Sequence, residues 1–112
     1  MLAAGIDIGS LSTDAVLINE KKEIVSSVVI PTGASSKDAA EKAFQEAMNK
    51  LKVQASDIDY TVSTGYGRAI VPFADHQVTE ITCHARGINH IRDSVRTLID
   101  IGGQDSKVIK AE

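Results

Sequence analysis

The chain has 112 residues, of which 43% are hydrophobic and 24% are charged, with a formal net charge of −3 and a pI near 5.6. This length predicts one small domain, residues 1–112, and the composition is that of an ordinary globular protein rather than of a disordered or fibrous one. The slightly acidic charge, with no run of Lys or Arg longer than a pair, argues against a surface for nucleic acid or for an anionic membrane.

Cys83 is the single cysteine, so the chain can form no internal disulfide and cannot alone supply a zinc or iron-sulfur site. We therefore expect a reducing, cytoplasmic setting. The apolar first residues carry no basic leader and are interrupted by Asp7, and no apolar run has the length needed to span a bilayer. The sequence thus indicates neither a secretion signal nor a membrane protein.

Segments rich in Val, Ile and Ala open the chain and predict three strands joined by hairpins, at residues 3–8, 13–19 and 23–30. Residues 35–52 begin with a serine suited to a helix N-cap and repeat apolar residues at helical spacing, which predicts a helix. Residues 58–65 then predict a strand, and residues 78–91 predict a second helix. Residues 95–112 predict a strand, a tight turn and the start of another strand.

The predicted order of elements is therefore βββαβαβ, with a further strand beginning at the end. A strand-helix-strand crossover after a three-strand antiparallel meander implies a mixed sheet with helices packed on it. This is the arrangement of ribonuclease-H-like folds. The sequence thus predicts an α/β domain of that type.

The tetrapeptide Ile-Asp-Ile-Gly occurs twice, in GIDIGSLSTDAVLI (residues 5–18) and in LIDIGGQDSKVI (residues 98–109). An acid inside a buried strand costs on the order of several kcal/mol unless it is paired, but at the carboxyl end of a strand it can project into a cleft. The glycine permits positive φ, and the turn after it can aim N–H groups and hydroxyls at an anion. We interpret the copies as opposing jaws that grip a polyphosphate, with Asp7 and Asp100 holding hydrated Mg²⁺.

The simpler alternative is that both copies are ordinary hairpins in which Asp7 and Asp100 cap local turns. Two copies with the same neighbours, together with Asp105 in the second turn, favour the clamp. The commoner phosphate-binding loops do not compete, because the chain contains neither G-x-x-x-x-G-K-[ST] nor G-x-G-x-x-G after a strand.

Four motifs in order make the chain resemble a known family: GIDIGSLSTDAVLI, STGYGR, EITCHARG and IDIGGQDSKVI. They are similar to the activator ATPases of 2-hydroxyacyl-CoA dehydratases and to the ATPase subunits of benzoyl-CoA reductase. These BadF/BadG/BcrA/BcrD-type ATPases belong to the actin, sugar kinase and heat-shock chaperone superfamily. The resemblance runs through almost the whole chain and implies a ribonuclease-H-like subdomain that binds ATP with Mg²⁺.

The resemblance also implies what the bound ATP is for. In this family, hydrolysis drives low-potential electron transfer from a [4Fe-4S] cluster that bridges two protomers. The electron acceptor is a dehydratase or reductase component that carries a CoA thioester. The cluster cysteines, the adenosine-binding elements and a second subdomain follow the second phosphate loop in the family. The 112 residues therefore resemble the amino-terminal, phosphate-binding part of a longer, homodimeric protein.

Roles for individual residues follow from the resemblance. The first phosphate loop would consist of Asp7, Gly9, Ser10, Ser12 and Thr13, and the second would consist of Asp100, Gly102, Gly103, Gln104 and Asp105. Glu80 begins the second predicted helix, where the superfamily often places an acid or amide that positions the attacking water. We expect Glu80 and Asp100 to take part in catalysis.

Several alternatives stay open. Glu80 could be a solvated helix-terminal acid, stabilised by the helix dipole. Cys83 and His84 share a helix face with Glu80, but Cys83 is better explained as a small buried residue than as a metal ligand. In STGYGR, Tyr66 and Arg68 could sense the nucleotide or contact a partner, or the segment could be a glycine turn with an exposed arginine. The chain as a whole could instead belong to a small-molecule kinase, or serve assembly without chemistry.

Overall fold

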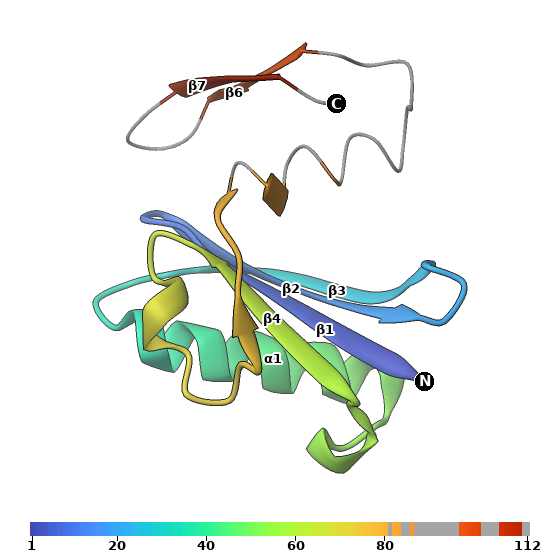
Figure 1. Cartoon of the computed structure of the whole chain (residues 1–112). Coiled ribbons are helices and arrows are strands. Elements are labelled where there is room, and N and C mark those ends of the chain that lie inside the picture. Colours follow the sequence, from blue (N-terminus) through green and yellow to red (C-terminus); the bar gives the residue numbers. More distant parts are fainter. Residues whose placement is uncertain (81, 84–85, 87–96, 102–105, 111–112) are drawn as a thin grey trace. The chain divides into compact units, whose positions relative to one another are not determined.

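The computed structural model describes residues 1–80, 82–83, 86, 97–101 and 106–110 (Figure 1). The chain divides into two compact units, unit 1 (Met1–Gln77) and unit 2 (Val78–Glu112). Each unit is described by itself below.

Unit 1 is built on a five-stranded mixed sheet in the order β3-β2-β1-β4-β5 (Figure 1). Its antiparallel meander consists of β1 (Leu2–Ile8), β2 (Ser12–Asn19) and β3 (Ile24–Pro31). Two further strands run parallel to β1, namely β4 (Tyr60–Gly65) and β5 (His76–Gln77). The predicted meander and the mixed, ribonuclease-H-like sheet are confirmed. The strand β5 is not among the predicted strands, because two residues carry no readable periodicity.

Helix α1 (Ser36–Leu51) covers one face of this sheet (Figure 1). Ser35 caps the helix, since its side chain accepts a hydrogen bond from the Asp38 N–H at 3.2 Å. The helix ends before Lys52, which adopts a left-handed φ of 59°. No helix in the described part of the chain has both the length and the apolar character needed to cross a membrane. The predicted apolar stripe is confirmed, and its buried members are Ala40, Phe44, Ala47 and Met48.

The hydrophobic core of unit 1 lies between α1 and the sheet. Alternate residues of β1 and β2 face it, each at most 4% exposed: Ala4, Ile6, Ile8, Ala15 and Leu17. Because side chains alternate along a strand, Asp7 and Asp14 project from the opposite face of the sheet. The first Ile-Asp-Ile-Gly copy therefore places its acid away from the core, at the carboxyl end of β1.

Short 3₁₀ helices flank β4 in unit 1. The first, η1 (Ala55–Asp57), leads from α1 into β4, and the second, η2 (Arg68–Ile70), follows β4 after Tyr66 and Gly67. Phe73, beyond η2, stacks on Phe44 of α1 with ring centroids 4.7 Å apart. This contact ties the segment after β4 to the helix.

Unit 2 contains a two-stranded antiparallel sheet of β6 (Thr97–Ile101) and β7 (Ser106–Lys110). Both strands predicted near the end of the chain are thus confirmed, and the turn residues 102–105 lie outside the described residues. Within the predicted helix 78–91, the backbone is helical at Glu80, Thr82, Cys83 and Arg86. The other residues from Ile81 onward in this helix also lie outside the description.

Candidate functional site

Both copies of Ile-Asp-Ile-Gly adopt the same local structure, a strand end that leads into an antiparallel hairpin. Asp7 is the last residue but one of β1, which pairs with β2, and Asp100 is the last but one of β6, which pairs with β7. In these registers Asp7 lies opposite Asp14, and Asp100 lies opposite Lys107. The strand frame of both jaws is therefore confirmed. Asp7 belongs to unit 1 and Asp100 to unit 2, so the expectation that they face one another stays a prediction.

Three oxygen-bearing side chains form a row across the sheet face opposite α1. Asp7 of β1 is in register with Asp14 of β2 on one side and with Thr64 of β4 on the other. Asp14 Oδ1 and Thr64 Oγ1 are buried and have no hydrogen-bond partner within the described part of the chain. Buried polar oxygens normally have a partner, so two such atoms beside a carboxylate mark a place suited to a cation or a hydrogen-bonding ligand.

The electrostatics of this row also favour a hard cation. Burial raises the pKa of the Asp14 carboxyl above its ordinary value. Directly opposite residues on antiparallel strands have Cβ atoms about 4.5 to 5.5 Å apart, so the ionised carboxylates of Asp7 and Asp14 would repel one another. A divalent cation with oxygen ligands would relieve this repulsion. The row therefore fits Mg²⁺.

The turn between β1 and β2 is closed by the Gly9 N–H, which donates to the Ser12 carbonyl at 2.9 Å. Glycine is required here because a Cβ would lie 2.9 Å from that same carbonyl oxygen. Thr32 holds the turn from the other side: its hydroxyl donates to Gly9 O at 2.8 Å and its N–H donates to Leu11 O at 2.9 Å. Ser12 is exposed and Ser10 is half-buried, so their hydroxyls lie in a turn that the rest of the unit keeps fixed.

The structure places Thr13 differently from the other residues expected in the first phosphate loop. Its side chain lies on the core face of the sheet, 0% exposed, and its hydroxyl hydrogen-bonds the Thr32 hydroxyl at 2.8 Å. Strand alternation turns Thr13 away from the face that carries Asp7. Thr13 thus supports the turn from inside. Its partner Thr32 is not among the predicted site residues, because no local pattern links the end of β3 to the turn after β1.

The loop after β4, within STGYGR, closes on the end of β1. Gly65 has a φ of 90°, and a side chain there would overlap Asp7 Oδ1 and the Ile8 carbonyl. The Gly67 N–H donates to Ile8 O at 3.1 Å, and a Cβ at Gly67 would lie 2.6 Å from Ile8 Cγ2. The two glycines therefore let the loop backbone lie directly against the acid and its neighbour.

Arg68 and Tyr66, in the same motif, have different surroundings. Arg68 is half-buried and its Nη1 donates to the Gly65 carbonyl at 3.0 Å. The Arg68 carbonyl in turn accepts from the hydroxyl of Ser63, a buried residue, at 2.8 Å. Tyr66 is 79% exposed. The alternative of a glycine turn with an exposed arginine is therefore wrong for Arg68, which is tied into the loop, whereas Tyr66 stands at the surface.

The remaining predicted site residues belong to unit 2. Glu80 is half-buried with helical backbone, next to Thr79, whose hydroxyl accepts from the Thr82 N–H at 3.4 Å. No group of three or more His, Cys, Asp or Glu side chains that could hold a metal occurs among the residues described. Four predicted residues lie outside the described ranges: Gly102, Gly103, Gln104 and Asp105.

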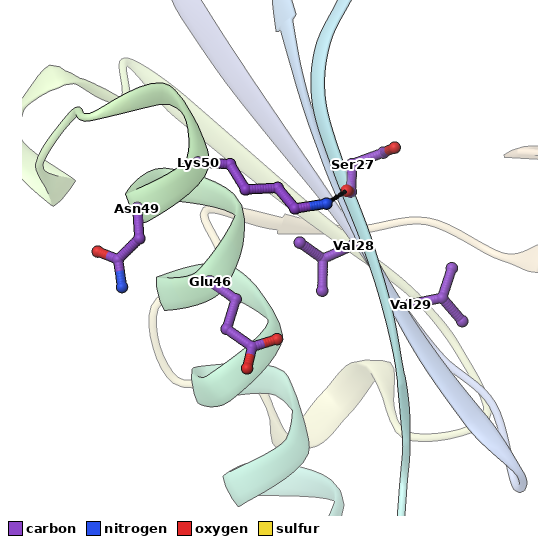
Figure 2. A pocket seen from close by; sticks show the side chains of 6 residues that line it. All are labelled: Ser27, Val28, Val29, Glu46, Asn49 and Lys50. Atoms are coloured by element: carbon purple, nitrogen blue, oxygen red, sulfur yellow. Dashed lines mark hydrogen bonds between the residues drawn. The ribbon is translucent and has the colours of Figure 1, made fainter.

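A hollow of unit 1 lies elsewhere, between β3 and α1, with a volume of about 570 Å³ (Figure 2). Its lining mixes valines with Glu46, Asn49 and Lys50 and brings together no set of catalytic groups. Figure 2 shows Lys50 reaching across it to Ser27, where its Nζ donates to the backbone carbonyl at 3.0 Å. Because β3 is an edge strand, we interpret this contact as protection of the edge. The row at Asp7 is therefore a better candidate site than this hollow.

The sequence itself matches a known family of ATPases. Residues 4–112 match the BadF/BadG/BcrA/BcrD ATPase family. The chain belongs to this family. A curated relative, the activator of lactoyl-CoA dehydratase from Anaerotignum propionicum, is 43% identical over 112 residues, which are 100% of this chain and 43% of that protein.

Solved structures agree with this assignment. Component A of the (R)-2-hydroxyglutaryl-CoA dehydratase from Acidaminococcus fermentans has a TM-score of 0.93 at 35% identity, over 100% of this chain and 43% of its own. The activator of the 2-hydroxyisocaproyl-CoA dehydratase from Clostridium difficile, with bound ADPNP, has a TM-score of 0.90 at 40% identity, over 98% of this chain and 41% of its own. The predicted actin-like ATPase fold is confirmed. The chain spans about two fifths of the length of these BadF/BadG/BcrA/BcrD-type relatives.

The residues present do not fit the iron-sulfur cluster that the resemblance implies. Such a cluster is held by several thiolates, and Cys83 is the single cysteine of the chain. Cys83 is half-buried. The cluster therefore plays no part in the chemistry derived from these residues.

Proposed function

We propose that this chain is the amino-terminal, phosphate-binding subdomain of an ATP-hydrolysing activator of a 2-hydroxyacyl-CoA dehydratase or a benzoyl-CoA reductase-type enzyme. Membership of the BadF/BadG/BcrA/BcrD ATPase family and the likeness to an activator that holds ADPNP support this proposal. The observation that carries it is the row of Asp14, Asp7 and Thr64, in which a strand-end carboxylate is flanked by two buried oxygens that have no hydrogen-bond partner among the residues described.

In unit 1, Asp7 would hold Mg²⁺, which when bound neutralises charge on the phosphates. Ser10 and Ser12 would donate their hydroxyls to phosphate oxygens, and each such bond to a charged oxygen contributes roughly 1.5 to 3 kcal/mol. Gly9 keeps the turn narrow, because a side chain there would meet the Ser12 carbonyl. Thr13 supports the same turn through its hydrogen bond to Thr32.

Unit 2 would supply the opposing jaw. Asp100 would share the metal, and the second phosphate loop would bind the phosphates from the other side through Gly102, Gly103, Gln104 and Asp105. Glu80 would orient water in line with the γ-phosphate, since positioning supplies much of the rate enhancement in phosphoryl transfer.

The complete activator is proposed to be a cytoplasmic homodimer that carries a [4Fe-4S] cluster on residues outside this chain. Its partner would be the dehydratase or reductase component that binds the CoA ester. The printed functions of the relatives, which activate lactoyl-CoA and 2-hydroxyisocaproyl-CoA dehydratases, support this choice of partner.

The decisive variant is Asp7→Asn in the full-length protein. We expect kcat for Mg²⁺-dependent ATP hydrolysis to fall roughly 100-fold, the scale observed when one group that stabilises a charged transition state is removed. The fold should survive, because Asp7 lies off the core. Phosphate release under steady-state conditions and a thermal melt measure the two effects.

Asp38→Asn is the matched control, because Asp38 is an exposed carboxylate in the first turn of α1. It should hydrolyse ATP like the wild type. Unchanged turnover in Asp7→Asn would contradict the proposed function. Phosphate recovered on an added sugar or carboxylate would instead identify a small-molecule kinase, and absence of nucleotide binding would identify an assembly module.

A further inference from the structure

The loop after β4 lies against Asp7 at Gly65, and Arg68 donates a hydrogen bond to the Gly65 carbonyl. We propose that Arg68 is a positioning residue for Asp7: by fixing the Gly65 backbone against the end of β1, it sets the orientation in which the Asp7 carboxylate meets the metal. This inference rests on the proposed function. It adds Arg68 as a residue that influences metal binding through Asp7.

The first step is the closeness of Gly65 to Asp7. A Cβ built on Gly65 would overlap both Asp7 Oδ1 and the Ile8 carbonyl, so the backbone of Gly65 forms a wall beside the carboxylate. The β1–β4 pairing places Asp7 opposite Thr64 and Ile8 opposite Gly65. This pairing fixes the backbone of Asp7 and does not by itself set the torsions of its side chain. The wall at Gly65 therefore limits the orientation of the carboxylate.

Second, the backbone of Gly65 must itself be held in place if it is to limit the Asp7 carboxylate. Gly65 has a φ of 90°, and a loop with glycines at positions 65 and 67 loses more backbone entropy on ordering than other segments do. A small number of hydrogen bonds hold it. The Gly67 N–H donates to Ile8 O at 3.1 Å, and Arg68 Nη1 donates to Gly65 O at 3.0 Å.

The third step is that Arg68 is itself anchored. Its carbonyl accepts from the hydroxyl of the fully buried Ser63 at 2.8 Å, and its side chain is half-buried. Of the bonds that hold the loop, the one from Arg68 to Gly65 has a charged donor, and such bonds are stronger than neutral ones. Loss of this bond should leave the sheet intact and let Gly65 move. Misplacement of a reacting group by about 1 Å can cost roughly 100-fold in rate.

The test compares Arg68→Ala and Arg68→Lys with the wild type in the full-length protein. Mn²⁺ replaces Mg²⁺, and its binding to the protein with ADPNP is followed by electron paramagnetic resonance. In Arg68→Ala the half-saturating Mn²⁺ concentration should rise about tenfold, the scale of one bond to a charged group, and kcat for ATP should fall. Binding of ADPNP without metal should stay within about twofold, well below the tenfold that one such bond is worth. Arg68→Lys should recover much of the metal affinity, because an ammonium N–H can reach the same carbonyl.

The matched control is Lys21→Ala, which removes an exposed cation from the turn between β2 and β3, and it should match the wild type in all readouts. Wild-type Mn²⁺ affinity in Arg68→Ala would overturn the inference, as would an Arg68→Lys variant no better than Arg68→Ala. Equal losses of metal binding and metal-free ADPNP binding would show that the loop has a general structural role only, and would also overturn it. If the wild type binds no ADPNP, the proposed function fails as well, whereas an active wild type with an unaffected Arg68→Ala rejects the positioning role alone.

Discussion

At the scale of single residues, Asp7 and Asp14 occupy neighbouring positions on one sheet face and differ in their surroundings. Asp7 rests against Gly65, while Asp14 Oδ1 is buried without a hydrogen-bond partner among the described residues. A buried oxygen without a hydrogen bond lowers the free energy of unfolding unless a ligand binds it. Perturbed carboxylates of this kind concentrate at functional sites. Asp14 is therefore the residue most worth adding to the site predicted from the sequence.

The variant Asp14→Asn should raise stability at neutral pH. Burial raises the pKa of Asp14 in the folded state above its unfolded value, so the folded state binds more protons and the free energy of unfolding falls as pH rises between these two pKa values. Removing the charge should raise the free energy of unfolding at pH 7 by up to about 1 kcal/mol, a modest gain because the side chain is partly solvated. Below pH 3.8, the ordinary value for the carboxyl, the gain should vanish.

Urea unfolding followed by circular dichroism, at pH 7 and near pH 3, measures this difference. A gain of the same size at both pH values would contradict the assignment, because protonation would then play no part. If Asp14→Asn also loses Mn²⁺ affinity in the presence of ADPNP, the carboxylate that destabilises the fold would be the one that binds the metal.

At the scale of elements, α1 both covers the core and protects an edge of the sheet. Its apolar stripe packs on β1, β2 and β3, while Lys50 at its end donates to the Ser27 carbonyl of the edge strand β3. The outward side chains of β3 include Val29, which is 70% exposed, and Ile24 and Val25 are exposed as well. An apolar edge strand is prone to pair with another chain, and lysine is a common means of preventing it.

The variant Lys50→Ala should therefore associate more readily with itself. Its free energy of unfolding should change by less than about 1 kcal/mol, since the lost contact lies at the surface. Sedimentation velocity over a range of protein concentrations measures the association. Lys37→Ala, at an exposed lysine in the first turn of α1, is the control and should behave as the wild type. Equal association of both variants would show that net charge, and not protection of the edge, is responsible.

At the scale of the whole molecule, the hydrophobic core formed by the described side chains belongs to unit 1. All buried residues of the core cluster, from Ala4 to Val71, lie within Met1–Gln77, and so do the partly buried residues packed against it. The β1–β2 hairpin that carries Asp7 is thus held by unit 1 itself. The predicted second jaw belongs to Val78–Glu112.

Residues 1–77 alone should therefore fold cooperatively. At the low end of about 0.05 kcal/mol per residue, a free energy of unfolding near 4 kcal/mol is expected. This segment should bind ADPNP with Mn²⁺ far more weakly than the full-length protein, because it lacks the second jaw. Urea unfolding and the Mn²⁺ titration measure both properties. A gradual, non-cooperative transition would show that unit 1 needs unit 2 to fold.

Features that depend on residues close together in the chain could be predicted from the amino-acid sequence. The apolar stripe around Phe44 predicts α1, Ser35 predicts its cap, and the repeated Ile-Asp-Ile-Gly predicts two acids at strand ends, all as the structure has them. Each of these signals comes from helical or strand periodicity and from local hydrogen bonds. The family motifs are also local, because each lies at the end of a strand or helix. Their resemblance to a known family predicted the fold.

The side chains that surround Asp7 and the turn after β1 could be identified only once the fold was known. Thr32 reaches the turn at Gly9 from the end of β3, and Gly65 lies against Asp7 through the parallel pairing of β1 with β4. The same pairing brings Thr64 beside Asp7, whereas the pairing of β1 with β2 places Asp14 beside Asp7 and Thr13 on the core face. These contacts join residues far apart in the chain. They depend on strand order and register, which one sequence does not specify locally.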